Sequence, residues 1–386
     1  MNKTFERRVM VTGGCGFLGN HLVRHLVKNK KNWQIINYDA LTYAGIKENL
    51  KDIENEGNYV FVKGDIRCVP DIESVFDKYQ ITDVIHLAAE SHVDNSIQGP
   101  RLFIETNIVG TFNLLDVART KWINYGGLSG HRFYYFSTDE VFGFLNENGA
   151  PFKETTSLNP TSPYSTSKAC GDFLVKSYNK TYGLETIISH CCNIIGSAQL
   201  PEKMVPATIQ RILNNEPIIV YDKGEQVREW IYTDDIVSAA MAVFEKGVPG
   251  EAYNIGSGNE CRNIDLVNMI IETLWMRKGI DRDEVRGCIK YVTNARPGHD
   301  FRYAINTDKI KAELGWGGAE NDMVDCVQKT VDWYLANQEW INNLSSRKND
   351  GNKYLTMASK NVYDIFAENN LMTDGDMTNT DVLLTN

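Results

Sequence analysis

The stretch Val9-Met10-Val11-Thr12-Gly13-Gly14-Cys15-Gly16-Phe17-Leu18-Gly19 decides the fold. A short apolar run, typical of a buried parallel strand, leads directly into glycines and then into apolar residues at helical spacing. Glycine permits a tight turn and a close approach of the backbone to a pyrophosphate, and the helix N-terminus offers free N–H groups to an anion. The stretch therefore predicts a dinucleotide site at Gly13, Gly16, Phe17, Leu18 and Gly19.

The second predicted strand, 35–39, ends on Asp39, twenty residues after Gly19. A carboxylate at this place accepts hydrogen bonds from ribose hydroxyls and repels a 2′-phosphate, which favours NAD over NADP. Asp65, in Gly64-Asp65-Ile66, is a candidate contact to the adenine, and a cap at the end of a strand is the alternative.

Further strands are expected at 59–62, 83–89, 132–137 and 185–189, with helical stretches between most of them. This alternation predicts an α/β fold with a doubly wound parallel sheet. After Asn193 prolines interrupt the pattern, and helices are expected near 204–214 and 263–276. We expect an NAD-binding Rossmann domain over 1–190, to which a segment near 228–246 returns. A smaller α/β substrate domain is expected over 191–340, and a partly disordered C-terminal tail over 341–386.

Tyr164 and Lys168 are four residues apart and so share one helix face. A nearby ammonium, together with the positive charge of a nicotinamide, would lower the tyrosine pKa, and Tyr164 would then take a proton from a sugar hydroxyl. Thr138, at the end of the fifth strand, is placed to hydrogen-bond the same hydroxyl, since ligands lie at the carboxyl ends of the strands. Surface decoration is the alternative for the Tyr/Lys spacing alone.

Asp139 and Glu140 follow the same strand end. If both line a pocket, their environments must separate their roles, one protonated as an acid and the other ionised as a base. A solvated loop is the alternative. An acid and a base beside a hydride-transfer site would allow the removal of water from an oxidised sugar.

The fourth strand ends in Leu87-Ala88-Ala89-Glu90-Ser91, where small residues allow close approach of a cofactor and Ser91 is a candidate sugar contact. His86 and His92 lack a matching set of ligands, so we expect structural roles and no metal. Arg228 and Arg296 are candidates for a pyrophosphate clamp, because arginine makes bidentate contacts to phosphate oxygens. Surface ion pairs are the alternative.

The composition excludes several classes of protein. The formal net charge of −10 argues against a nucleic-acid binder, which would present a basic face. Eight cysteines without a Cys-x-x-Cys pair indicate neither zinc nor a disulfide framework and fit a reduced cytoplasmic setting. Because there is no apolar run of membrane-spanning length and no secretory signal, we expect no membrane association.

From residue 9 to about 335 the chain resembles the extended short-chain dehydrogenases/reductases and, more narrowly, the dTDP-glucose 4,6-dehydratases. The resemblance is carried by Thr12-Gly-Gly-Cys-Gly-Phe-Leu-Gly19, Leu87-Ala-Ala-Glu-Ser-His-Val-Asp94, Ser137-Thr-Asp-Glu140, Pro163-Tyr-Ser-Thr-Ser-Lys168, Pro201-Glu-Lys203, Gln226-Val-Arg-Glu-Trp230, Tyr253-Asn-Ile-Gly256 and Arg296-Pro-Gly-His-Asp300. It implies a nucleotide-sugar substrate and a bound NAD that is regenerated in each turnover.

The resemblance also implies roles for individual residues. Tyr164 would be the base for oxidation at C4, with Lys168 and Thr138 beside it, Glu140 would take the C5 proton, and Asp139 would protonate the departing C6 hydroxyl. The cofactor would further contact Thr42, Ile66, Leu87, Ala88, Ala89, Ser91 and Thr106. The nucleotide sugar would be held by Ser91, Thr138, Asn193, Lys203, Arg228, Asn263, Arg296 and His299.

The chain departs from the family at one important place. The family usually shows Asn-Asn-Tyr-Gly-Pro after the sixth strand, where this chain has Asn193-Ile194-Ile195-Gly196-Ser197. Asn193, which corresponds to the substrate-contacting Asn of the family, is kept. The other replacements could alter the binding of the cofactor or of the sugar. Phe142 replaces a usual Tyr, and the tail beyond 341 has no counterpart.

Three other functions remain open. UDP-glucose is the alternative substrate, and a C4 epimerase on the same scaffold is the alternative enzyme, although epimerases generally lack the Asp139-Glu140 pair. The third is a nucleotide-sugar-binding or NAD-binding regulator without turnover. We also expect a homodimer through two helices, one near 106–118 with Phe112, Leu114, Leu115 and Val117 and one from Tyr164 with Phe173, Leu174 and Val175.

Overall fold

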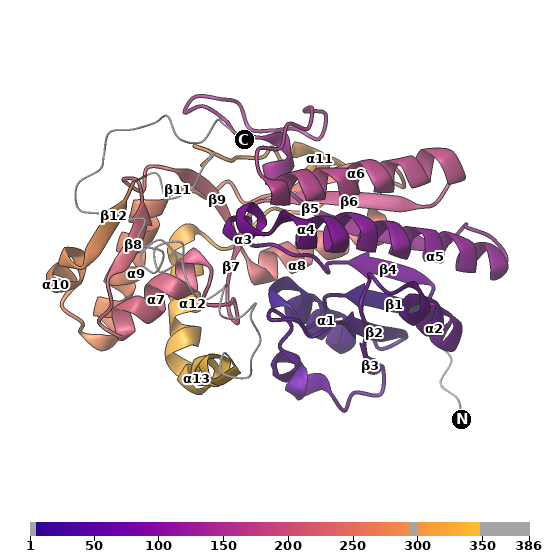
Figure 1. The fold of residues 1–386 in the computed structure, drawn as a ribbon, viewed down its shortest axis with the longest axis horizontal. Coiled ribbons are helices and arrows are strands. Elements are labelled where there is room, and N and C mark those ends of the chain that lie inside the picture. Colours follow the sequence, from indigo (N-terminus) through magenta and orange to yellow (C-terminus); the bar gives the residue numbers. More distant parts are fainter. Residues whose placement is uncertain (1–4, 294–298, 348–386) are drawn as a thin grey trace, which may run out of the picture.

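A sheet of seven parallel strands forms the centre of the larger part of the molecule (Figure 1). The computed structural model describes residues 5–293 and 299–347. The strand order is β10-β6-β5-β4-β1-β2-β3, so the direction of winding reverses between β1 and β4, where α/β proteins bind ligands. The strands are β1 (Arg7–Thr12), β2 (Trp33–Asp39), β3 (Tyr59–Lys63), β4 (Asp83–His86), β5 (Arg132–Thr138), β6 (Thr186–Cys191) and β10 (Ala252–Ile255).

The predicted doubly wound parallel sheet is confirmed, with two differences. β4 ends at His86, because the N–H groups of Leu87 and Ala88 donate to the carbonyl and hydroxyl of Thr12, both at 3.2 Å, and turn the chain out of the sheet. β10 was not predicted: it has four residues and joins the edge of the sheet beside β6 from far along the chain.

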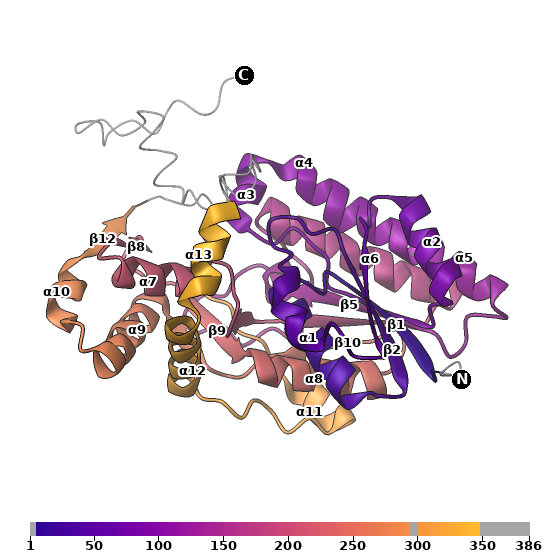
Figure 2. The ribbon, with the colours of Figure 1, turned by 90° about the horizontal axis from the view of Figure 1, so that it is seen from below.

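Helices cover both faces of the sheet (Figure 2). One face carries α1 (Phe17–Asn29), α8 (Thr233–Lys246) and α11 (Asp308–Leu314), and the other carries α2 (Val69–Tyr79), α5 (Thr111–Asn124) and α6 (Pro163–Tyr182). Short helices α3 (Val93–Gln98) and α4 (Pro100–Phe103) and the helical turns η1 (Lys47–Ile53), η2 (Ile104–Gly110) and η3 (Asp139–Phe142) lie in the connections.

Side-chain alternation along β1 supplies both cores. Val9 and Val11 pack with α1 and α8, whereas Met10 points to the opposite face and packs with Phe76 and Leu114. Successive side chains of a strand point to opposite faces, so a strand with helices on both sides is apolar throughout. The short apolar run before the glycines has this property.

A second group of elements lies beside the carboxyl end of the sheet (Figure 1). It contains a three-stranded sheet, β11-β9-β7, and a two-stranded sheet, β12-β8, packed with α7 and α9. The elements are β7 (Asn193–Ile195), α7 (Met204–Leu213), β8 (Ile218–Tyr221), β9 (Val227–Tyr232), β11 (Glu260–Arg262), α9 (Asn263–Lys278), α10 (Arg282–Gly287), β12 (Ile289–Val292), α12 (Met323–Ala336) and α13 (Gln338–Arg347). α7 and α9 lie where helices were predicted.

The segment near 228–246 connects the two groups. Its first half is β9 in the three-stranded sheet, and its second half is α8, which packs against α1 and β6 of the main sheet. The division of the chain into domains remains a prediction.

Helix α13 runs past the boundary expected at residue 340 and joins both groups (Figure 2). Leu344 is buried with Tyr43 and Ile46, which follow β2, and with Leu200. The Trp340 indole N–H donates to Asn49 Oδ1 at 2.7 Å. Residues 348–386 of the expected tail lie outside the described residues, and across the described ranges no helix is long and apolar enough to cross a membrane.

We expect Leu344→Ala to lower the free energy of unfolding by about 2–5 kcal/mol, because it leaves a cavity in this cluster. Chemical denaturation measures the change. Asn342→Ala, at an exposed position of the same helix, is the control and should have little effect. Equal stabilities of Leu344→Ala and the unchanged chain would show that α13 does not hold the two groups together.

Candidate functional site

A cavity of about 400 Å³ opens at the carboxyl end of β5 and β6 and extends between β8, β9 and α7. This volume is in the range of small-molecule sites. The structure brings ten of the predicted residues to its wall: Phe17, Ser91, Thr138, Glu140, Tyr164, Asn193, Lys203, Arg228, Asn263 and His299. Arg296 lies outside the described residues.

The glycine turn after β1 has the geometry that a dinucleotide requires. Gly13 has φ +70°, in the left-handed region that favours glycine, and a Cβ at Gly19 would lie 2.1 Å from the Gly13 carbonyl oxygen. Gly16 caps α1 without a side-chain hydrogen bond, so the first N–H groups of this helix are available to an anion. The turn therefore fits the pyrophosphate of NAD.

Asp39 closes β2 beside this turn. Its Oδ2 accepts from the Cys15 N–H at 2.9 Å and its Oδ1 from the Leu41 N–H at 2.8 Å. Burial raises the pKa of this carboxyl, while the two backbone hydrogen bonds oppose that rise. A carboxylate has about four acceptor positions, so two bonds leave capacity for ribose hydroxyls. Leu41 itself has φ +52°, an uncommon conformation for a bulky residue.

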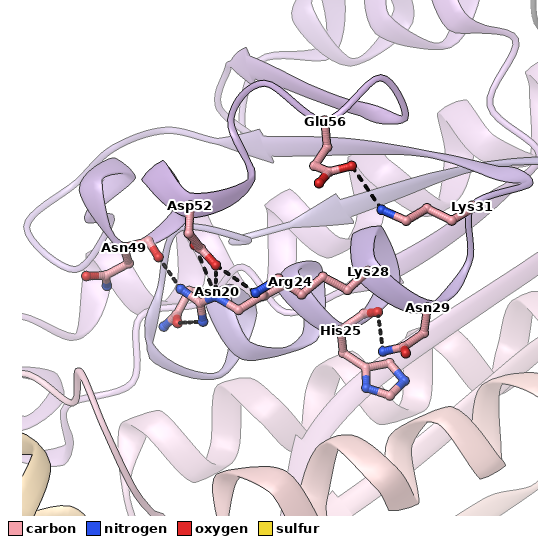
Figure 3. A network of polar contacts seen from close by, with 9 residues as sticks. All are labelled: Asn20, Arg24, His25, Lys28, Asn29, Lys31, Asn49, Asp52 and Glu56. Carbon is pink, nitrogen blue, oxygen red and sulfur yellow. Dashed lines mark hydrogen bonds and ion pairs between the residues drawn. The ribbon is translucent and has the colours of Figure 1, made fainter.

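The chain after Asp39 is held by a polar network between α1 and η1 (Figure 3). Asp52 accepts from Arg24 Nε at 3.0 Å and from Lys28 Nζ at 2.9 Å, and Arg24 also donates to the Asn49 carbonyl. These bonds fix the far end of the loop that contains Thr42. Thr42 itself is exposed.

The remaining cofactor candidates surround this region. Asp65 pairs with the Arg67 guanidinium and accepts the Arg67 N–H at 2.9 Å. These contacts correspond to the strand-end cap that was the alternative to an adenine contact. Ile66 is buried in the core, and Thr106 is half-buried in the π-helical turn η2. Leu18 and the segment Leu87, Ala88 and Ala89 are half-buried near the glycine turn. Cofactor contacts of all these residues remain predictions.

Tyr164 lies in the first turn of α6 and lines the cavity together with Thr138, which ends β5. A capping box between Ser162 and Ser165 fixes the start of this helix. Burial first, and then the Glu140 carboxylate, raise the pKa of Tyr164 well above its ordinary value. The protein alone therefore does not lower the pKa of Tyr164. The lowering expected from the sequence requires the positive charge of the cofactor as well.

Lys168 is 5% exposed, and its Nζ donates to the Phe136 carbonyl of β5 at 2.6 Å. Burial lowers the pKa of the Lys168 ammonium to about 8, against an opposing effect of Asp172. The ammonium also lies 4.1 Å from the centre of the Tyr135 ring. The helix face shared by Tyr164 and Lys168 therefore points at the end of β5.

Asp139 and Glu140 have different surroundings, as their proposed roles require. Glu140 lines the cavity, and its N–H donates to Thr138 Oγ1 at 3.3 Å. Asp139 is only 1% exposed, and its Oδ1 accepts from the Thr138 hydroxyl at 3.3 Å. Burial, and then the Glu140 and Glu229 carboxylates, raise the pKa of Asp139 well above its usual range. These surroundings therefore favour the protonated form of Asp139.

The distal wall of the cavity carries the candidates for a diphosphate. Arg228 is stacked 4.3 Å from the Tyr303 ring centre and donates through Nη2 to the Asp300 carbonyl at 2.9 Å. His299 Nδ1 lies 3.4 Å from Asp222 Oδ2. Lys203 also lines the cavity, and its Nζ donates to the Ser91 carbonyl at 3.0 Å and bridges the two groups of elements.

Several cavity residues were not singled out from the sequence. Tyr221 ends β8 and Arg211 lies on α7, in a part of the chain without a clear strand pattern. Tyr303 follows Arg296-Pro-Gly-His-Asp300 by only three residues, and its nearness to that string was the available signal. Glu202 lines the cavity too, and burial raises its pKa to about 7.

His86 and His92, for which structural roles were predicted, both make hydrogen bonds within the fold, and His92 also lines the cavity. His86 is hydrogen-bonded to Thr12 Oγ1 at 2.7 Å and to Thr111 Oγ1 at 3.0 Å, and His92 caps α3. In the described ranges no cluster of histidine, cysteine and carboxylate side chains could hold a metal ion. All eight cysteines are free thiols.

The expected dimer face needs correction. Leu114, Leu115, Val117 and Val175 are buried in the core beneath the sheet, because α5 and α6 turn these residues inward. Phe112 and Phe173 are exposed, by 44% and 62%. The segment near 106–118 is also not one α-helix, since η2 is a π-helical turn before α5 begins.

Comparison with known proteins identifies the class. The family model described as GDP-mannose 4,6 dehydratase matches residues 10–329. The dTDP-glucose 4,6-dehydratase of Salmonella typhimurium is 45% identical over 356 residues, which cover 88% of this chain and 96% of that protein. The fold and the matches define the chain as a nucleotide-sugar dehydratase of the extended short-chain dehydrogenase/reductase type.

Solved structures of a dehydratase and of an epimerase both resemble this chain. The dTDP-glucose 4,6-dehydratase of Bacillus anthracis, solved in complex with NAD, is 37% identical with a TM-score of 0.77 and covers 88% of this chain and 99% of its own. The UDP-glucose 4-epimerase of Thermotoga maritima is 29% identical with a TM-score of 0.74, covering 86% and 99%. The chain belongs to the dTDP-glucose 4,6-dehydratase family.

The raised pKa of Asp139 has a consequence for stability. The folded state holds this proton more tightly than the unfolded state, so the penalty for burying Asp139 is absent at low pH and grows as the pH rises. We therefore expect Asp139→Asn to melt at a higher temperature than the unchanged protein, with a difference that increases towards alkaline pH. Calorimetry across the pH range measures it, with the exposed Asp71→Asn as control. A difference independent of pH would contradict the burial of a proton at Asp139.

Proposed function

We propose that this protein converts dTDP-glucose to dTDP-4-keto-6-deoxyglucose with bound NAD. The observation that carries the proposal is the meeting of Thr138, Glu140 and Tyr164 on one cavity wall, with Asp139 buried beside them and its pKa raised. A base for oxidation, a carboxylate base and a carboxylic acid are the groups that oxidation followed by loss of water requires.

Tyr164 takes the proton of the C4 hydroxyl, and Thr138 orients that hydroxyl, because both side chains line the cavity at this end of β5. The Lys168 ammonium is held nearby by its hydrogen bond to the Phe136 carbonyl of the same strand. Bound NAD supplies the hydride acceptor for C4, the hydride donor for C6 and a positive ring next to Tyr164.

The C4 ketone acidifies the proton at C5, and Glu140 removes that proton. Asp139 gives its proton to the C6 oxygen, which leaves as water. The two adjacent carboxyls can act in opposite senses because burial keeps Asp139 protonated while Glu140 faces the cavity. Glu140 then returns a proton to C5 as C6 is reduced. Because the product keeps its C4 ketone, Tyr164 releases the C4 proton to solvent and Asp139 regains a proton, which resets both groups for the next turnover.

The nucleotide diphosphate is assigned to the wall formed by Asn193, Lys203, Arg228, Asn263 and His299, with Arg296 as a further candidate. Arg228 is held in place by Tyr303 and by backbone carbonyls, and a guanidinium positioned in this way suits a pyrophosphate. The replacement of the family pattern by Ile194 and Ile195 leaves Asn193 on the cavity wall.

Incubation of the purified protein with dTDP-glucose and, separately, UDP-glucose tests the proposal by mass spectrometry. We expect loss of one water from dTDP-glucose and, in heavy water, one deuterium at C5 of the product. Glu140→Gln should lower kcat by a factor of about 10²–10⁴, because it removes a positioned base. Exposed Glu216→Gln is the control. Inversion at C4 without loss of water would favour an epimerase, and loss of water from UDP-glucose alone would reassign the substrate.

We also propose a homodimer formed through the exposed apolar residues of η2, α5 and α6. Phe112 and Phe173 are joined on this side by Ile104 and Val109, which are about half exposed. α5 and α6 pack against each other, so these residues belong to one surface. A cytoplasmic location is proposed as well, because eight free thiols fit a reducing compartment.

Light scattering tests the dimer. We expect twice the chain mass for the unchanged protein at micromolar concentration and a monomer for Phe173→Glu, because a buried carboxylate would oppose association. Trp275→Glu, an exposed aromatic residue on α9, is the control and should remain dimeric. A monomeric unchanged protein would refute the proposal.

A further inference from the structure

A second pair of ionisable residues is buried directly behind the catalytic helix face. Asp172 lies one turn after Lys168 on α6, and His190 lies on β6. His190 Nε2 is 2.8 Å from Asp172 Oδ2, and both side chains are completely buried. The mechanism above uses neither residue, and the sequence did not draw attention to them.

Asp172 accepts few hydrogen bonds for a buried carboxylate. A buried charge is costly unless hydrogen bonds or an opposite charge compensate it. Within the described chain, His190 Nε2 is its one hydrogen-bonding partner, and no donor reaches Asp172 Oδ1. An opposite charge is nearby, because residues four apart on a helix lie on the same face and Lys168 is four residues before Asp172.

The other groups around Lys168 are neutral. Burial, and then Lys168 itself, lower the pKa of His86 on β4 to about 3, and burial raises the pKa of Cys191 on β6 to about 12. Burial also raises the pKa values of Tyr135 on β5 and, without cofactor, of Tyr164 on α6. Among the described residues, Asp172 is the one carboxylate that acts on the Lys168 ammonium.

We propose that Asp172, held by His190, is a positioning residue that supplies the counter-charge for the Lys168 ammonium. His190 fixes the carboxylate from the neighbouring strand, while the aromatic ring of Phe142 packs 4.8 Å from the imidazole. The counter-charge keeps Lys168 protonated although it is buried, and the ammonium can then donate to the Phe136 carbonyl and favour the tyrosinate of Tyr164. The proposal rests on the proposed function only for this last effect.

The direct test is the titration of Lys168 in the full-length protein labelled with ε-¹³C lysine. Lys168→Met identifies the signal. We expect a midpoint near 8 in the unchanged protein and a midpoint lower by at least about one pH unit in Asp172→Asn, the size of effect that a close opposite charge produces. The alkaline limb of the pH profile of kcat should also move to lower pH in Asp172→Asn, because a smaller fraction of the molecules keeps Lys168 protonated at a given pH.

Two His190 variants cover the case in which Asp172→Asn does not fold. His190→Phe removes the donor that holds the Asp172 carboxylate in place, so the Lys168 midpoint should fall. His190→Gln places an amide N–H near the Nε2 position and should restore the midpoint. Asp83→Asn, which breaks the partly exposed ion pair of the buried Asp83 with Arg7 at the opposite end of the sheet, is the matched control. It should lower the melting temperature without moving the Lys168 midpoint.

An unchanged Lys168 midpoint in both Asp172→Asn and His190→Phe would overturn the proposal and leave the pair a structural role only. The titration does not depend on turnover. A protein that fails to dehydrate dTDP-glucose but shows the expected shift would refute the proposed function and keep the counter-charge.

Discussion

The site depends on the hydrogen bond from the Lys168 ammonium to the Phe136 carbonyl, at 2.6 Å. A buried ammonium requires such an acceptor, and here the acceptor belongs to the strand that ends in Thr138. The bond therefore fixes the first turns of α6 against β5 and places Tyr164 beside Thr138. The glycine turn after β1 lies at the same edge of the parallel sheet, so cofactor and catalytic residues meet without a long loop.

Burial separates the roles of the two neighbouring carboxyls. Asp139 is removed from water and keeps its proton, while Glu140 faces the cavity. The same burial has a cost at Tyr164, whose pKa is raised rather than lowered in the protein alone. In the proposed function, the protein fixes the position of the Tyr164 hydroxyl, and bound NAD would contribute the positive charge that lets this hydroxyl act as a base.

The sequence was sufficient for what local patterns determine. The glycine turn, six of the seven strands and the Tyr164/Lys168 helix face follow from spacing and hydrophobicity. The seventh strand could not be predicted, because β10 is short and joins the sheet through a distant pairing. Leu114 and Val175 were assigned to an interface because their apolar character does not tell which side of the helix faces the core. The pairing of Asp172 with His190 joins a helix and a strand and leaves no signal in spacing.

We propose that one cavity performs oxidation, loss of water and reduction on the same sugar molecule. The most direct test is a crossover measurement with dTDP-glucose deuterated at C4, mixed with ¹³C-labelled dTDP-glucose without deuterium. Mass spectrometry of the products should show the deuterium in the C6 methyl group of the unlabelled-carbon molecules only. Deuterium lost to water, or found in the ¹³C-labelled product, would contradict a single closed site.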